Sequence, residues 1–153
     1  MNLRGEQAAL IGRIWSEVAL VERASALENF ETILLLLGLP KLDKGRDLYQ
    51  SASLLTDLRN ALMHYKLQNR EVGLDPDENA SGDKLAQFEK GLGGRFAKNP
   101  LTRKGNPLFP DRMIGHGTAE WSVNTAVAFL DGFCQSLSAM PPYEHIRPTF
   151  ATR

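Results

Sequence analysis

The sequence predicts an all-α protein built as an antiparallel helical bundle. Apolar residues recur at spacings of three and four along much of the chain, which is the period of one helix face. No segment shows the convincing alternation of apolar and polar residues that is typical of a β-strand. Glycine and proline separate the helical stretches, so consecutive helices are expected to turn back on one another.

The first helical stretch covers residues 7–37 and contains no proline. Its apolar residues follow one helix face: Leu10, Ile11, Ile14, Val18, Val21, Ala26, Phe30, Ile33, Leu34 and Leu37. The stretch forms either one long helix or a broken pair, with Gly12 and Ser25 as the places for a bend. Gly38 and Pro40 are expected to end it.

A second helix is expected to begin within residues 43–45 and to end near Lys66. Its apolar stripe consists of Leu48, Ala52, Leu55, Leu58, Leu62 and Tyr65. Residues 67–116 then form a long irregular excursion, because this segment is rich in proline and glycine.

The excursion is expected to contain one short helix, capped by Ser81 or Asp83 and ended by Gly93 and Gly94. Its first half is acidic and its second half is basic. Six residues of the basic half and its end are RNA-binding candidates: Arg95, Lys98, Arg103, Lys104, Arg112 and His116. Phe96 and Phe109 are available there for stacking on bases. The alternative is a solvated loop that faces the acidic half.

A last helix is expected from a cap at Thr118 to about Ser138, and prolines 141 and 142 close it. The following residues lack periodicity and form a strap or a frayed end. We therefore expect one helical domain over residues 1–140 and a C-terminal tail over residues 141–153.

Composition limits the classes of function. Of the 153 residues, 42% are apolar, which is enough for one core. Eighteen basic and eighteen acidic residues cancel, so any attraction to nucleic acid must be local. Cys134 is the only cysteine and is expected to be a buried, reduced thiol in a cytoplasmic protein. The polar N-terminus predicts that the protein is not exported. The longest apolar run is too short to span a membrane, so no membrane partner is expected.

The candidate catalytic residues lie in the hexad Arg59-Asn60-Ala61-Leu62-Met63-His64, in the last turns of the second helix. A guanidinium binds phosphate oxygens in a fork and stabilises extra negative charge in a transition state. An imidazole moves protons near neutral pH, and Asn60 can orient it or donate to phosphate. This chemistry suggests attack of a ribose 2′-hydroxyl on the adjacent phosphate of RNA. No metal or other cofactor is expected, since no cluster of metal ligands is evident.

Helical geometry restricts this site. At about 100° per residue, Arg59 and His64 point roughly 140° apart on an ideal helix, whereas Asn60 and His64 share a face. A tight site therefore requires that the helix end loosens or that a second chain contributes across a twofold axis.

The hexad, near the end of a helix in a small helical chain, resembles the signature of the HEPN superfamily. That signature is an arginine, usually beside a polar residue, with a histidine a short distance further along the helix. Members are mostly all-α dimers, and many are metal-independent endoribonucleases of toxin-antitoxin, phage-defence and RNA-processing systems. The resemblance implies phosphate binding by Arg59, support by Asn60 and acid-base chemistry by His64. It also implies RNA as substrate, a homodimer, and a cognate antitoxin or defence partner.

The chain departs from this family in two places. The excursion is longer than a compact member needs, and it is expected to reshape or cover the cleft. In one toxin branch a tyrosine two places beyond the histidine is modified by a partner nucleotidyltransferase, but Lys66 occupies that place here. That regulation is not expected.

Other readings of these residues remain open. In the structural alternative, Arg59 forms an ion pair with Asp57 or with a glutamate of the first helix, and His64 caps the carbonyl groups at its own helix end. In functional terms the chain is then a non-catalytic HEPN-like interaction or nucleotide-binding module. Three roles are open for His116: a second catalytic imidazole, an anion contact at the start of the last helix, or a residue of a turn. Exposure of Arg59 and His64 discriminates between the enzyme and the module.

Overall fold

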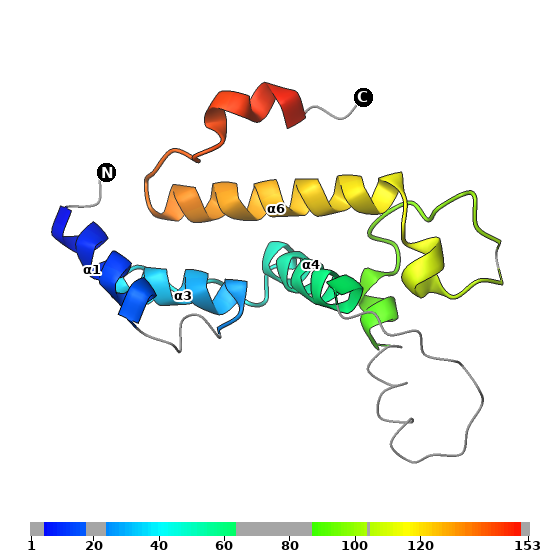
Figure 1. Cartoon of the computed structure of the whole chain (residues 1–153), viewed down its shortest axis with the longest axis horizontal. Helices are drawn as coiled ribbons and strands as arrows, with labels where there is room; N and C mark the ends of the chain where they lie inside the picture. The colour runs from blue at the N-terminus through cyan, green and yellow to red at the C-terminus, as the bar shows by residue number, and fades with distance from the viewer. Residues whose placement is uncertain (1–4, 18–23, 64–86, 104, 151–153) are drawn as a thin grey trace, which may run out of the picture. The chain divides into compact units, whose positions relative to one another are not determined.

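The computed structural model describes residues 5–17, 24–63, 87–103 and 105–150. Within these ranges the chain is mostly helical and contains no strand (Figure 1), which confirms the all-α prediction. None of the helices in the described ranges is long and apolar enough to cross a bilayer. The chain divides into two compact units. We name Met1–Ser53 with Ala126–Arg153 the terminal unit, and Leu54–Thr125 the central unit.

The first helical stretch is broken, and its described residues form α1 at Gly5–Glu17 and α3 at Ala26–Leu36. Ser25 caps α3 in a reciprocal pair of hydrogen bonds. Its hydroxyl accepts from the Glu28 amide at 3.3 Å, and its own amide donates to the Glu28 carboxylate at 2.7 Å. These bonds lower the pKa of Glu28. Among the residues that the structure describes, the helical stretch is therefore broken at Ser25, whereas Gly12 lies inside α1.

Gly38 ends α3 as the sequence predicts. Its φ of 65° is left-handed, a conformation that glycine adopts without the steric cost of a side chain. The amides of Gly38 and Leu39 donate to the carbonyls of Leu35 and Leu34, at 3.1 and 2.9 Å. These two backbone hydrogen bonds form a Schellman-type C-cap, which ends α3 and turns the chain toward the next helix.

Helix α4 spans Asp47–Met63, so it begins slightly later than the sequence predicts. Asp43 and Gly45 instead form a turn in which the Gly45 amide donates to the Asp43 carboxylate at 2.9 Å. Helix α6 spans His116–Ser136. The prediction that Thr118 caps it was wrong, because the helix begins before this residue and the buried Thr118 hydroxyl donates to the Met113 carbonyl.

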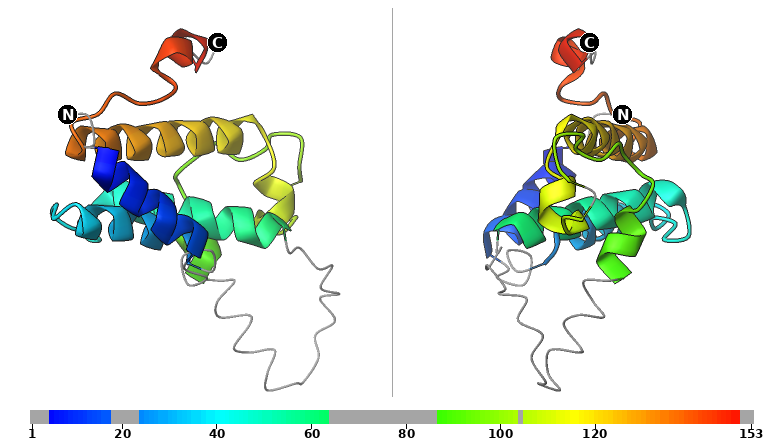
Figure 2. Two further views of the ribbon diagram at one scale, coloured as in Figure 1. Left: turned by 60° about the vertical axis from the view of Figure 1, so that its left-hand side comes forward. Right: turned by 90° about the vertical axis from the view of Figure 1, so that its right-hand side faces the viewer.

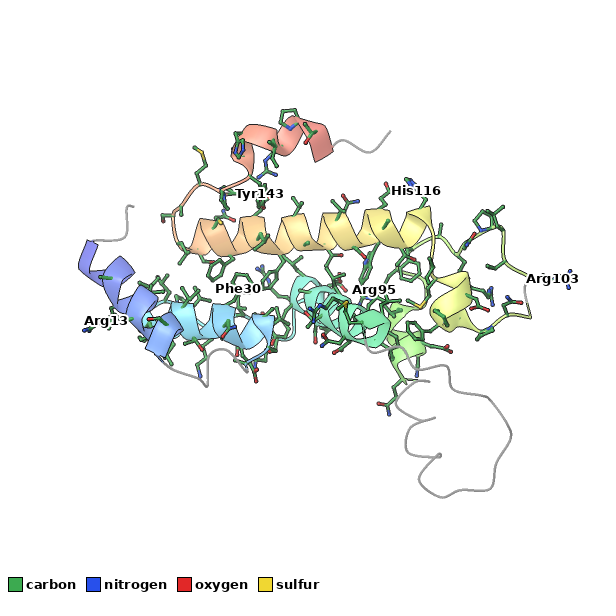
Figure 3. All side chains as sticks on the ribbon, in the orientation of Figure 1. Arg13, Phe30, Arg95, Arg103, His116 and Tyr143 are labelled. Carbon is green, nitrogen blue, oxygen red and sulfur yellow. The ribbon has the colours of Figure 1, made fainter. Side chains whose placement is uncertain are left out.

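The terminal unit has a core around Leu27, Ala52 and Phe129, which come from three different helices. Phe30 lies edge-on to Phe129 and to Phe133, with ring centroids 5.2 and 4.6 Å apart. Figure 3 shows the Phe30 side chain directed toward α6. Cys134 is a buried free thiol, as predicted, and burial raises its pKa.

The tail is attached to the terminal unit. Glu144–Phe150 form a 3₁₀ helix, η2, which lies on the opposite side of α6 from α3 (Figure 2). The Arg147 guanidinium donates to both carboxylate oxygens of Asp131, at 2.7 and 3.0 Å, and to Glu144 at 2.7 Å. The Tyr143 hydroxyl donates to Asp131 at 2.7 Å. Of the two alternatives for the tail, the described residues form the strap.

The central unit contains the described half of the predicted excursion. Residues 87–92 are helical and are followed by Gly94 at φ 81°, in agreement with the predicted end of a short helix. Leu92 and Met113 are buried against Leu58 of α4. A side chain at Gly91 would bring its Cβ to 2.9 Å from Leu54, so this short helix packs closely on α4.

The segment between this short helix and α6 is also packed. Leu108–Arg112 form a short π-helical turn, η1, in which Phe109 is extended. The side-chain nitrogen of Asn99 donates to the Ile114 carbonyl at 2.7 Å, and the backbone N–H of Asn99 donates to the Arg112 carbonyl at 2.8 Å. A Cβ at Gly117 would overlap the Ala97 carbonyl oxygen. The basic half of the excursion is therefore held against the start of α6.

Candidate functional site

Arg59 and Asn60 lie on the exposed face of α4. Leu58, the residue before them, is only 3% exposed and packs in the core of the central unit. Arg59 and Asn60 are both exposed. Burial of Leu58 fixes the rotation of this part of α4, and so directs the next two side chains to solvent.

The guanidinium of Arg59 donates from Nη1 to the side-chain oxygen of Asn60, at 2.9 Å. Adjacent helix positions point about 100° apart, so the long arginine side chain must bend around the helix to make this contact. The bond uses the side-chain oxygen of Asn60 as acceptor and leaves its amide nitrogen, a donor, outside this contact. The two side chains together present N–H donors to an anion.

No ion pair links Arg59 to Asp57 within the part of the chain that the structure describes. Asp57 is exposed and precedes Arg59 by only two positions, which is a poor spacing for contact on a helix. The alternative in which Asp57 neutralises Arg59 is therefore not what these residues form. The positive charge of Arg59 is available to a ligand.

His64, the proposed acid-base residue, lies outside the described residues, and so does Lys104 of the RNA-binding candidates. The last residues of α4 before it are apolar and exposed. Leu62 is 43% and Met63 is 67% exposed, although the sequence predicts Leu62 as part of the buried stripe. The end of α4 thus combines a cation with an apolar surface.

The basic candidates that the structure describes differ in exposure and in contacts. Arg95 is half-buried, and its Nε donates to the carbonyl of Gly91 at 3.0 Å, at the end of its own short helix. Lys98 and Arg103 are exposed, whereas Arg112 is half-buried in η1. Figure 3 shows Arg103 far out on its loop, apart from Arg95.

His116, the last of the RNA-binding candidates, is the first residue of α6 and is exposed. Its Nε2 lies 3.9 Å from the carboxylate of Glu120, one turn further along the helix. Figure 3 shows His116 on α6, well away from Arg103. Its nearby carboxylate makes this position less favourable for an anion than the exposed Arg59.

The two phenylalanines suggested for base stacking are part of the central core. Phe96 packs on Trp121 with ring centroids 5.6 Å apart, and Phe109 packs edge-on to Phe88 at 5.7 Å. Both are half-buried. Rings that are already packed against other rings offer less area for bases, so this packing disfavours a stacking platform here, which stays a prediction.

Sequence reasoning did not identify Asn99, which holds the basic segment in place. Its carboxamide oxygen accepts from the Leu101 amide at 2.9 Å, while its nitrogen donates to Ile114. The only local signal is the Asn99-Pro100 pair, which favours a turn but does not specify the distant partner. No group of three or more histidine, cysteine, aspartate or glutamate side chains that could hold a metal occurs in the described ranges.

In comparisons with known proteins, no family model, no curated protein and no solved structure matches this chain. The resemblance to the HEPN superfamily therefore rests on the hexad and its helical context.

Proposed function

We propose that the chain is a HEPN-like, metal-independent endoribonuclease that folds as an antiparallel bundle. Arg59 binds the scissile phosphate, Asn60 supports it, and His64 is the general acid and base. The observation that carries the proposal is the exposed Arg59 guanidinium, bonded to Asn60 and paired with no carboxylate in the described ranges. Such a group is preorganised to bind a phosphate.

The proposed reaction needs only these side chains and RNA. His64 takes the proton of the ribose 2′-hydroxyl, and that oxygen attacks the adjacent phosphorus. The bond to the 5′-oxygen of the next nucleotide breaks, and the leaving oxygen receives a proton from the imidazolium. The products are a cyclic phosphate end and a 5′-hydroxyl end. Arg59 stabilises the additional negative charge of the transition state.

The bond between Arg59 and Asn60 supports this division of roles. It draws the guanidinium toward the side of α4 on which Asn60 lies. The helical period predicts that position 64 shares this side. An arginine that reaches toward Asn60 is thus expected to lie nearer to position 64 than the ideal helix angle between Arg59 and His64 predicts.

The proposal includes a homodimer in the cytoplasm, with a cognate antitoxin or defence partner. Its support is the exposed apolar pair Leu62 and Met63 beside the phosphate-binding residues. Apolar side chains of this size at a helix end are stabilised when a second copy covers them. Light scattering at micromolar concentration is expected to give a dimer, and Met63→Glu is expected to weaken it. A monomeric wild type would contradict this part.

A second candidate is a non-catalytic HEPN-like interaction or nucleotide-binding module. The packing of Phe96 and Phe109 favours it, because a surface without stacking rings holds the phosphates of RNA but reads few bases. In this case Arg59 docks the phosphate of a nucleotide or an acidic partner.

The test is incubation of the purified protein with mixed RNA in EDTA, followed by analysis of the new ends. Wild type and the control Arg13→Ala, which removes an exposed arginine of α1, are expected to leave cyclic phosphates. Arg59→Ala and His64→Ala are expected to leave the RNA intact. Equal cleavage by all four proteins, or none by wild type, would reject the nuclease. Binding that depends on Arg59 without cleavage would establish the module.

A further inference from the structure

The terminal unit contains a cavity of about 400 Å³ that the proposed ribonuclease does not use. It is open to solvent on one side and is lined by Leu34 of α3, the link between α3 and α4, the first turn of α4 and the second half of α6. Its size is within the usual range for pockets that hold small organic molecules.

The inner wall of the cavity is apolar and well packed. Leu34 is 1% exposed, and Phe129 and Phe133 are 7% exposed. Phe30, which is not part of the lining, packs edge-on against both rings. Tyr49 adds another aromatic ring to the lining. A wall of this kind fits the apolar body of a ligand and needs little rearrangement to receive it.

The space exists partly because position 132 carries no side chain. Gly132 lines the cavity from the interior of α6, where glycine is unfavourable for the helix. A Cβ there would meet only the Leu48 side chain, at 3.8 Å, which is ordinary contact. A larger side chain at 132 would therefore extend into the cavity and not into the packed core.

The opposite side of the cavity is polar and exposed. Lys41, Asp43 and Arg46 line it, and all three are exposed. Asp43 already accepts the Gly45 amide, at 2.9 Å. Lys41 and Arg46 form no ion pair within the described ranges. The nearby Lys44, by contrast, is paired with Glu31 at 3.2 Å. The rim therefore has two cations available and favours a negative group.

We propose that this cavity binds a small amphipathic organic anion. Its ring-sized apolar body lies against Phe129, Phe133 and Tyr49, and its carboxylate, sulfonate or phosphate contacts Arg46 and Lys41. The site is separate from Arg59, so its binding does not depend on the proposed ribonuclease activity.

The test uses two fluorescent probes that differ in one group. Anilinonaphthalene sulfonate is anionic, and phenylnaphthylamine has the same rings without the sulfonate. The sulfonate is expected to saturate one site per chain and to bind more tightly than the neutral probe. Arg46→Gln should lower the affinity for the sulfonate by about three- to tenfold, which is the size of one ordinary hydrogen bond at an exposed rim, and leave the affinity for the neutral probe unchanged.

Filling the cavity should weaken both probes. Gly132→Leu is expected to cost at least about tenfold in affinity, while leucine also improves the helix propensity of α6. The matched controls are Gly12→Leu, at an open position of α1, and Arg13→Gln. Neither should change binding. Circular dichroism is used to establish that each variant is folded. The site would be overturned if folded Gly132→Leu kept wild-type affinity, or if Gly12→Leu lost as much affinity as Gly132→Leu. The preference for anions would be overturned if Arg46→Gln changed the affinity for both probes equally.

Discussion

The two units differ in how the chain builds them. The terminal unit joins segments from both ends of the sequence, and its contacts include the strap from Arg147 to Asp131. The central unit is one continuous stretch, and its core forms between the end of α4, the short helix at 87–92 and the segment before α6. Local contacts close quickly during folding, whereas contacts between chain ends close slowly. The central unit, which carries Arg59, is therefore the one expected to form without the chain ends.

The largest expected effect concerns exposed arginines of the two units. Arg59→Ala should lower the rate of RNA cleavage by about 10²–10³, because the transition state loses a charge-assisted contact. Arg13→Ala in the terminal unit should change it little. Arg59→Lys keeps the positive charge but loses the two-pronged guanidinium, so its cleavage rate should lie between those of Arg59→Ala and Arg13→Ala. Single-turnover kinetics on one RNA measures all three, and comparable losses in Arg13→Ala would show that the effect is not specific to this site.

Truncation of each core tests whether the units are energetically distinct. Leu34 and Leu92 are both 1% exposed, in the terminal and central unit respectively. Either change to alanine should cost about 2–5 kcal/mol in its own unit. Urea unfolding followed by Trp121, in a Trp15→Phe background, reports on the central unit. We expect a larger shift of this transition for Leu92→Ala, and identical shifts would mean that the chain unfolds as one unit.

A smaller effect is expected at the turn that ends α3. Gly38→Ala should destabilise the terminal unit by about 1–2 kcal/mol, because alanine is strained at a left-handed φ. Gly12→Ala, inside α1, should instead be neutral or slightly stabilising. Thermal unfolding of both variants provides the measurement. A stable Gly38→Ala would show that the reversal after α3 does not need this backbone conformation.

The smallest effect is the pH dependence of the strap. Hydrogen bonds from Arg147 and Tyr143 lower the pKa of Asp131, so the folded state favours the carboxylate. This contribution is present above the usual pKa of about 4 and is lost as the pH falls through the lowered value. Burial and the bond to Asp131 raise the pKa of Tyr143 to about 12. The neutral phenol then stabilises the fold below about pH 10, and its contribution is lost between about 10 and 12.

The strap is tested by melting temperatures across the pH range. Asp131→Asn should flatten the acid side of the curve, and Tyr143→Phe should flatten the alkaline side. Unchanged curves would mean that solvent screens the exposed ion pairs completely.

The local parts of the fold could be predicted from the sequence. The break at Ser25, the end of α3 at Gly38 and the end of the short helix at Gly94 depend on caps and glycines within a few residues. The role of Thr118 was predicted wrongly because its partner is the preceding Met113 carbonyl, not an amide of its own helix. The sequence did not decide between a strap and a frayed end for the tail, because an ion pair between η2 and α6 leaves no periodic pattern in the tail residues.

The candidate site follows the same division. Exposure of Arg59 agrees with the hexad interpretation, because burial of Leu58 sets the helix rotation. The Arg59–Asn60 bond was not predicted, because ideal helix positions ignore the reach of a long side chain. Phe96 and Phe109 resembled base-stacking residues in a basic segment, yet their partners Trp121 and Phe88 are set by tertiary packing alone.

The close approach at Gly117 has a consequence for the evolution of the protein. A Cβ there would overlap the Ala97 carbonyl oxygen, a backbone atom, so the central unit is expected to tolerate little but glycine at this position. A Cβ at Gly91, by contrast, would meet only the flexible end of the Leu54 side chain. A distant relative that has lost Arg59 or His64, and with them the proposed chemistry, should still carry Gly117. This glycine therefore offers a way to recognise relatives of this fold that is independent of the hexad.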